Sequence, residues 1–206
     1  MKLSTCFKNL VVLLLTLLTT QCGKNSGAPD VAPAPSDALF EHLSPGATGV
    51  DFANVVEENY DNNIMTNSYL YNGGGVGVLD FNNDGLVDLY FTRTQGSCKL
   101  YQNLGNLKFK DVTEQAGVQA MEGEKTGVAI ADVNADGWPD IYVCRTGMQP
   151  TDARRNLLFI NNKNGTFTEM GRPFGLADGA ATNQANFFDA DGDGDLDCYV
   201  LNYPVN

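Results

Sequence analysis

A nine-residue segment that occurs three times constrains the fold of this chain more than any other feature. The copies begin at Asp80, Asp132 and Asp189 and read DFNNDGLVD, DVNADGWPD and DADGDGDLD. Each has oxygen-bearing side chains at positions 1, 3, 5 and 9 and glycine at position 6. This spacing is typical of a loop that binds a hard divalent cation through oxygen ligands. Three copies make a chance match a poor explanation.

The ligands of each loop follow from these positions, with a backbone carbonyl at position 7 and a closing carboxylate at position 9. The expected set is Asp80, Asn82, Asp84, the Leu86 carbonyl and Asp88 in the first loop, Asp132, Asn134, Asp136, the Trp138 carbonyl and Asp140 in the second, and Asp189, Asp191, Asp193, the Asp195 carbonyl and Asp197 in the third. Ca²⁺ suits such sets because its coordination is flexible, whereas Mg²⁺ demands a strict octahedron. We expect up to three Ca²⁺ ions. The third loop has the most carboxylates and should bind Ca²⁺ most tightly.

Two other interpretations of the loops are an EF-hand and a turn without a metal. An EF-hand requires an acidic residue at position 12, where this chain has Phe91, Val143 and Val200. It also requires flanking helices, and the flanking segments here predict strands. The second alternative is an Asx-rich β-turn without a metal, but such a turn does not require acids at positions 1, 5 and 9.

The segments around each loop alternate between apolar and small or polar residues, which predicts β-strands. A second pair of strands around an Asn/Gly turn is predicted after the first loop and again after the second. The predicted strands cover 75–79 and 89–91, 127–131 and 141–143, and 184–188 and 198–200, and the predicted hairpins cover 100–109 and 158–167. One repeat is therefore four short antiparallel strands. The predicted fold class is all-β, a partial β-propeller of four-stranded antiparallel blades with a calcium loop between the first and second strands.

The residues at and after the first loop resemble a known family. Gly75-Val76-Gly77-Val78, followed by the loop at Asp80, resembles the FG-GAP (VCBS-type) repeat of integrin α-chain propellers. Together with the segment LYQNLGNLKFKDVTEQAGV at 100–118, it is similar to the cartilage acidic protein/UnbV (ASPIC) family of secreted proteins. The resemblance covers roughly 39–206, with Gln184 where glycine is usual. It implies Ca²⁺ within the blades and an extracellular binding scaffold.

The register of the repeats predicts an incomplete propeller. The third repeat stops before its third and fourth strands, and the segment from Phe40 to Val50 resembles the tails that begin at Phe109 and Phe167. We expect 40–43 to form a fourth strand that completes the last blade of a longer chain. The predicted domain, 39–206, is then about two and a half blades of an N-terminal fragment. An open sheet edge predicts aggregation or weak folding of this chain alone.

The N-terminus predicts export. Residues 1–21 combine Lys2 and Lys8 with an apolar centre at 10–18, which is too short to span a membrane. The sequence from Leu18 to Cys22 resembles a bacterial lipobox, so Cys22 is the expected lipidation site. The alternative is an ordinary secretory signal. Residues 22–38 are rich in Pro, Ala, Gly and Ser and predict an extended tether. The protein is expected at the cell surface, as an outer-membrane lipoprotein, or secreted.

Composition excludes some functions and leaves others open. A net charge of −12 disfavours nucleic-acid binding. His42 is the only histidine, and no GxSxG or HExxH motif occurs, so no enzymatic activity is expected. No disulfide framework is expected among the cysteines beyond Cys22, although a Cys98–Cys144 bridge is an alternative. Cys198 is predicted to be a small core residue.

The sequence thus predicts an exported, calcium-stabilised binding or adhesion module whose loops contact an unknown extracellular protein or glycan. Trp138 and residues 148–150 lie in or beside the longer loops of the second repeat, where they contact a ligand or pack in the core. Membrane association is expected only through the lipid on Cys22. The alternatives are the propeller portion of a secreted carbohydrate-active enzyme and a scaffold of a surface complex.

Overall fold

A computed structural model describes residues 38–148 and 151–204. The chain divides into two compact units, Met1–His42 and Leu43–Asn206. The predicted signal at 1–21, Cys22 and all but the last residue of the predicted tether at 22–38 lie outside the described residues. Among the described helices, none has the length and apolar character needed to cross a membrane.

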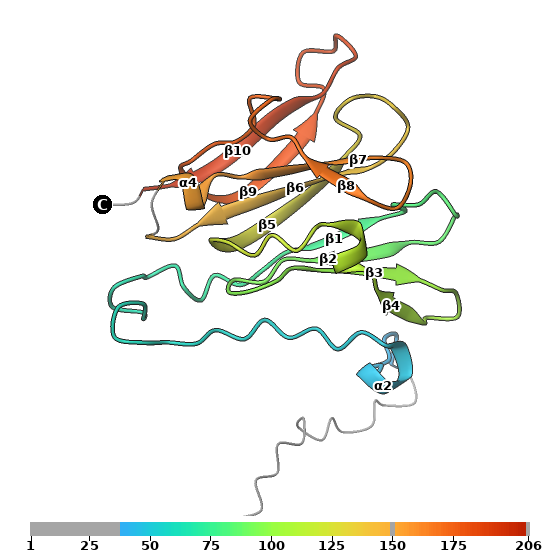
Figure 1. Cartoon of the computed structure of the whole chain (residues 1–206), viewed down its shortest axis with the longest axis horizontal. Helices are drawn as coiled ribbons and strands as arrows, with labels where there is room; N and C mark the ends of the chain where they lie inside the picture. The colour runs from blue at the N-terminus through green and yellow to red at the C-terminus, as the bar shows by residue number, and fades with distance from the viewer. Residues whose placement is uncertain (1–37, 149–150, 205–206) are drawn as a thin grey trace, which may run out of the picture. The chain divides into compact units, whose positions relative to one another are not determined.

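The unit Leu43–Asn206 is built from antiparallel sheets, two with four strands and one with two (Figure 1). The strands are β1 (Val76–Leu79), β2 (Asp88–Phe91), β3 (Lys99–Asn103), β4 (Phe109–Asp111), β5 (Glu124–Ala131), β6 (Asp140–Thr146), β7 (Leu157–Asn161), β8 (Phe167–Glu169), β9 (Ala181–Phe188) and β10 (Asp197–Tyr203). In the four-stranded sheets each strand pairs with its neighbours in the sequence. This architecture fits partial β-propeller blades, and the described sheets do not close a ring.

The strands predicted around the three loops and in the two hairpins are confirmed, and the structure extends several of them. Residues 181–183 and 201–203 lengthen the hairpin of β9 and β10, which pairs from Asp197↔Phe188 to Tyr203↔Ala181. β5 begins at Glu124, before the predicted start, and its register with β6 shifts between Lys125 and Val128. The alternating pattern located the strands but did not reveal these polar extensions.

Glycines in β1 and β5 allow the first strands of successive repeats to pack closely. β1 lies against β5, and β5 lies against β9. A Cβ atom on Gly77 would lie 2.8 Å from Ile130 Cδ1, and one on Gly75 would lie 2.9 Å from the Val128 nitrogen. Both distances are shorter than ordinary contacts, so a side chain here would push the sheets apart. Gly75 and Gly77 therefore allow close packing between the first and second repeats.

The core consists of two clusters between the sheets. The larger cluster joins the first and second repeats through residues such as Phe81, Tyr90 and Ile141. The second joins the second and third repeats and includes Tyr142. Cys198 is partly buried against the second cluster, which confirms the predicted core position in part. The three described cysteines are free thiols.

Short helices accompany the sheets. They are α2 (Pro45–Thr48), α3 (Thr113–Ala116) and α4 (Thr151–Arg154). α2 and α3 end in the same way, at Gly49 and Gly117, whose φ angles of 85° and 78° lie in the left-handed region. The likeness between the segment at 40–50 and the tail of the first repeat therefore lies in this capped turn. Residues 40–43 form no strand within the described residues, and their role in completing the last blade of a longer chain stays a prediction.

The segment at 51–72 contacts all three repeats without forming a strand. The Asn54 amide donates to Thr94 Oγ1 at 3.1 Å, in the first repeat. The Asn67 amide donates to the carboxylate of Glu124, in the second repeat, at 2.9 Å. The ring of Tyr69 stacks on Tyr203 of the third repeat with centroids 3.9 Å apart. This segment therefore ties the repeats together.

Candidate metal centre

The three acidic loops connect the first and second strands of their repeats, as predicted, and project from the same end of the sheets (Figure 1). In the first two loops the side chain of the aspartate at position 1 accepts hydrogen bonds from backbone N–H groups later in the same turn. Asp80 accepts hydrogen bonds from the backbone N–H groups of Asp84 at 3.0 Å and Gly85 at 2.8 Å. Asp132 accepts the equivalent bonds from Asp136 and Gly137. The aspartate at position 1 therefore stabilises the turn through both of its carboxylate oxygens.

Glycine at position 6 is required by the backbone of these loops. The φ angles of Gly85, Gly137 and Gly194 are 81°, 85° and 94°. A residue with a side chain is strained in this left-handed region. The sequence motif and the loop conformation therefore match at the residue where the chain reverses direction.

The aspartate at position 9 is built into the fold of the first two repeats. Asp88 and Asp140 are almost completely buried. Asp88 accepts hydrogen bonds from the backbone N–H of Phe81 at 3.1 Å and of Asn103 at 2.7 Å. Asp140 accepts them from Val133 at 3.0 Å and Asn161 at 2.8 Å. Each carboxylate therefore links its loop to the third strand of its own sheet.

Burial makes these two carboxylates costly to ionise. It raises the pKa of Asp88 to about 6, against the lowering effect of the two N–H donors, and Asp84 and Asp80 raise it further. The pKa of Asp140 is raised for the same reason, with Asp136 and Asp132 nearby. A cation at the loop would favour the charged form. A nearby positive charge would therefore lower the pKa of both buried aspartates and stabilise their ionised form.

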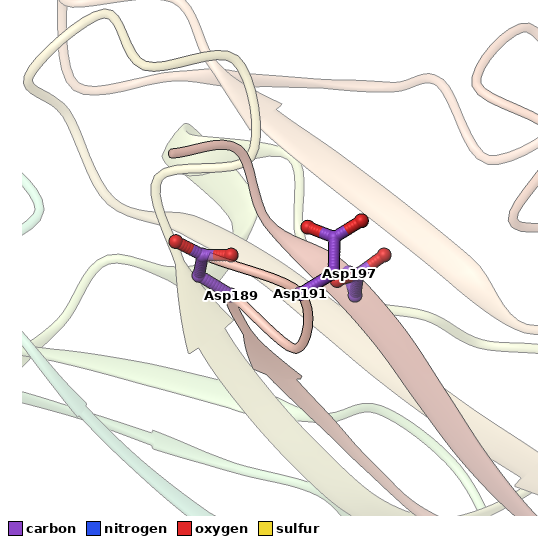
Figure 2. Close-up of side chains that lie close together, drawn as sticks. All are labelled: Asp189, Asp191 and Asp197. Atoms are coloured by element: carbon purple, nitrogen blue, oxygen red, sulfur yellow. The ribbon is translucent and has the colours of Figure 1, made fainter. Parts of the chain in front are cut away.

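The third loop brings three carboxylates together at the surface. Oxygen atoms of Asp189, Asp191 and Asp197 lie within 4.8 Å of one another, and all three residues are exposed (Figure 2). These are positions 1, 3 and 9 of the loop. Asp193, predicted at position 5, lies outside this group. The structure thus gathers three of the four predicted side-chain ligands of the third loop.

The donor chemistry of this cluster fits Ca²⁺. All three ligands are carboxylate oxygens, which hard cations prefer to sulfur or imidazole. Repulsion also extends to the rest of the loop, since the charge of Asp193 raises the pKa of Asp195. A divalent cation held by Asp189, Asp191 and Asp197 would relieve this repulsion. The Asp195 carbonyl and water can complete a coordination shell of six to eight oxygens.

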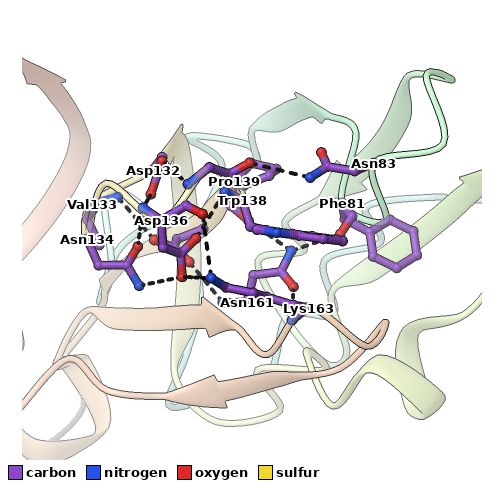
Figure 3. A network of polar contacts seen from close by, with 12 residues as sticks. Phe81, Asn83, Asp132, Val133, Asn134, Asp136, Trp138, Pro139, Asn161 and Lys163 are labelled. Atoms are coloured by element: carbon purple, nitrogen blue, oxygen red, sulfur yellow. Dashed lines mark hydrogen bonds and ion pairs between the residues drawn. The ribbon is translucent and has the colours of Figure 1, made fainter.

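The second loop differs from the third because a hydrogen bond and an ion pair are made to its carboxylate at position 5. The Asn134 amide donates to Asp136 at 3.0 Å, and Lys163 Nζ lies 3.3 Å from the same carboxylate (Figure 3). In the first loop Asn82 likewise donates to Asp84 at 2.8 Å. In the first two loops the asparagine at position 3 therefore donates to the aspartate at position 5. The third loop has an additional carboxylate, Asp191, at position 3.

Contacts between repeats hold the first and second loops together. The Asn161 amide of β7 donates to the backbone oxygen of Phe81 at 2.8 Å, and Asn83 donates to Gly137 O at 3.4 Å (Figure 3). Sequence reasoning missed Asn103 and Asn161, whose N–H groups bind the position-9 aspartates. Their equivalent places at the ends of β3 and β7 were the signal that could have identified them.

Comparisons with known proteins place these features in context. A model of the FG-GAP-like repeat matches residues 80–143 and 147–200, more than half of the chain. Cartilage acidic protein 1 of Xenopus tropicalis is 32% identical to this chain over 104 residues. That alignment covers 50% of this chain and 16% of the frog protein, so the chain spans a small part of its relative.

Proposed function

We propose, since this chain belongs to the FG-GAP-like repeat family, that it is an exported, calcium-stabilised module of the β-propeller type whose loops bind an extracellular protein or glycan. The observation that carries the proposal is the convergence of Asp189, Asp191 and Asp197. Extracellular fluid is rich in Ca²⁺, and the name of the similar frog protein, cartilage acidic protein 1, also points outside the cell.

Calcium acts on stability in this proposal. Each ion binds the folded loops and has little affinity for the unfolded chain, in which the ligands are far apart. Binding to the folded form alone stabilises it by mass action. The third loop contributes most, because its cluster is exposed and carries three carboxylates. The protein then folds fully where Ca²⁺ is abundant.

A calorimetric titration of the whole chain tests the calcium site. We expect Ca²⁺ to bind with a larger affinity than Mg²⁺, because the open cluster suits flexible coordination. Replacing Asp191 with Asn should weaken the tightest site about tenfold or more, since it removes one of three converging charges. The control is Asp61→Asn, which makes the same charge change outside the loops. Equal titrations for wild type and Asp191→Asn would contradict the assignment.

Export and anchoring form a second part of the proposal. The basic start, the apolar run at 10–18 and the placement of Cys22 support a cleaved lipoprotein signal. Mass spectrometry of the protein from a producing cell tests this. We expect an N-terminus at Cys22 with a diacylglycerol adduct, and Cys22→Ala should release the protein from the membrane fraction. An unmodified N-terminus elsewhere would favour the ordinary secretory signal.

A binding role is proposed in preference to a catalytic one. The regularly spaced acids are used in hydrogen bonds within the loops or converge as metal ligands, and those of the first two repeats are partly buried. Glycoside hydrolysis requires a pair of carboxyl groups free to exchange protons with a substrate. Absence of hydrolysis of polysaccharides by the purified chain is the expected result. Measurable hydrolysis lost in a single-carboxylate variant would favour the enzyme.

A further inference from the structure

A groove lies between the first and second repeats, beside their acidic loops. It has a volume of about 300 Å³ and is bordered by residues of both repeats. The residues that shape it are Phe81, Asn82, Gln102, Gln115, Trp138 and Asn164. This volume is at the lower end of the range for sites that bind small molecules. The groove is therefore large enough to take one or two units of a polymeric ligand that continues across the surface.

Trp138 gives the groove an aromatic side. The residue is half-buried, and its side chain reaches from the second loop toward Phe81 of the first (Figure 3). The backbone N–H of Trp138 donates to the Asp136 carboxylate at 3.0 Å, which fixes the backbone at this residue. The indole offers a flat, rigid, apolar surface together with one N–H donor. Such a surface suits a ring-shaped ligand that has both apolar and polar edges.

The remaining lining is polar but carries little charge. Within the described residues, neither Gln102 nor Gln115 uses its side-chain amide in a hydrogen bond, and Gln115 is exposed. A carboxamide offers donors and an acceptor side by side, which matches adjacent hydroxyl groups. Lys163 is the only charged residue that borders the groove, and Asp136 pairs with it at 3.3 Å. The groove therefore favours a neutral ligand rich in hydroxyl groups.

We infer that this groove binds a neutral oligosaccharide. A pyranose ring stacks on Trp138, and its hydroxyl groups form hydrogen bonds with Gln102 and Gln115. This inference rests on the proposed function, because it names the ligand class of the same binding module. No carboxylate borders the groove, but Asn82 and Trp138, which also belong to the predicted calcium loops, do.

Tryptophan fluorescence tests the inference directly, because Trp138 is the only tryptophan in the chain. The whole chain is titrated in calcium buffer with cellohexaose, chitohexaose and mannohexaose. We expect a saturable change of emission with at least one of these three neutral sugars. Polygalacturonate, an anionic glycan, and a tryptophan-free peptide mixture serve as comparison ligands. No saturable change with any of the three sugars overturns the inference, and so does a response to the peptide mixture alone.

Variants separate a specific site from a general effect. Trp138→Ala should weaken the binding of the active sugar at least tenfold by calorimetry, and Gln115→Ala should weaken it about three- to tenfold through the loss of one or two hydrogen bonds. Gln119→Ala is the matched control, because Gln119 lies on the same tail but does not border the groove. Unchanged sugar binding by Trp138→Ala would overturn the inference.

The calcium titration separates this inference from the proposed function. If Ca²⁺ binds with the affinities expected and no sugar binds, the groove assignment is wrong and the calcium module stands. If a sugar binds at Trp138 and Ca²⁺ does not bind, the groove assignment stands and the calcium module is wrong.

Discussion

The first two acidic loops and the third have almost the same sequence pattern but different surroundings. In the first two, the position-9 aspartate is buried and accepts hydrogen bonds from its loop and from the third strand of its sheet. In the third, Asp197 is exposed and accepts one hydrogen bond, from the N–H of Ala190 at 2.9 Å. The third loop instead gathers three carboxylates at the surface.

This difference follows from the sheets around the loops, because a third strand supplies an N–H group to Asp88 and to Asp140, and no described third strand does so for Asp197. In the first two repeats the position-9 aspartate connects the loop to the third strand through hydrogen bonds that do not require a metal. The third loop also has hydrogen bonds of its own, to Asp189 and Asp197, but its exposed carboxylates at positions 1, 3 and 9 repel one another, and a cation would relieve this repulsion. Dependence on Ca²⁺ should therefore be concentrated in the third loop, while the first two contribute to stability through their buried aspartates. Four predictions test this comparison, from the largest expected effect to the smallest.

Replacing Asp140 with Ala should have the largest effect on stability. It leaves the N–H groups of Val133 and Asn161 without their acceptor, one of them in a buried strand. An unsatisfied buried donor costs about 1–3 kcal/mol, so we expect a loss of about 2–4 kcal/mol in the free energy of unfolding. Urea denaturation in EDTA measures it. Asp197→Ala is the matched control and should lose far less, and equal losses would remove the distinction between the loops.

Replacing Asn161 with Ala should weaken the contact between the first two repeats. Its buried amide donates to Phe81 O and to Pro139 O. We expect a loss of about 1–2 kcal/mol, because two backbone oxygens lose their donor. The equivalent Asn103 donates to Val87 O within its own repeat and is more exposed, so Asn103→Ala should cost less in the same urea experiment. A larger loss of unfolding free energy for Asn103→Ala than for Asn161→Ala would argue against a stabilising contact between the two repeats at Asn161.

Exchanging the residues at position 3 should transfer calcium affinity between loops. Asn134→Asp adds a carboxylate to the second loop, and Asp191→Asn removes one from the third. We expect the first change to strengthen Ca²⁺ binding by the second loop and the second change to weaken that of the third, each by roughly tenfold, because affinity follows ligand charge. Calorimetry on the single and double variants measures this. Affinities that do not depend on position 3 would contradict the role given to it.

Replacing Lys163 with Ala should have the smallest effect. Its ammonium group lies 3.3 Å from Asp136, at the surface. Surface ion pairs contribute little to stability, so the urea midpoint in EDTA should not change measurably. The loss of a nearby positive charge should strengthen Ca²⁺ binding by the second loop about twofold to threefold at low salt. Lys108→Ala, a lysine of the first repeat, controls for net charge, and an equal gain there would assign the effect to the whole surface.

The sequence predicted the repeats and the strands because both depend on local patterns. Alternation located β1 to β10, and the nine-residue motif located the hairpins between first and second strands. Glycine at position 6 of the motif lies in the tight turn of each loop. These features are determined by residues within about ten positions of one another.

The features that the sequence did not predict depend on contacts between distant residues. The burial of Asp88 and Asp140 requires N–H groups of the third strands, and the bond from Asn161 to Phe81 joins two repeats. The path of residues 51–72 across the repeats has no periodicity that could reveal it. The strand predicted at 40–43 depends on partner strands of a longer chain, so it stays a prediction.

The melting temperature of the whole chain in Ca²⁺ and in EDTA tests the central claim most directly. At a Ca²⁺ concentration about 100 times the dissociation constant of the tightest site, we expect a midpoint about 5–10 °C higher than in EDTA. Asp191→Asn should lose most of this difference at the same Ca²⁺ concentration. A midpoint that is the same in Ca²⁺ and in EDTA would contradict a calcium-stabilised fold.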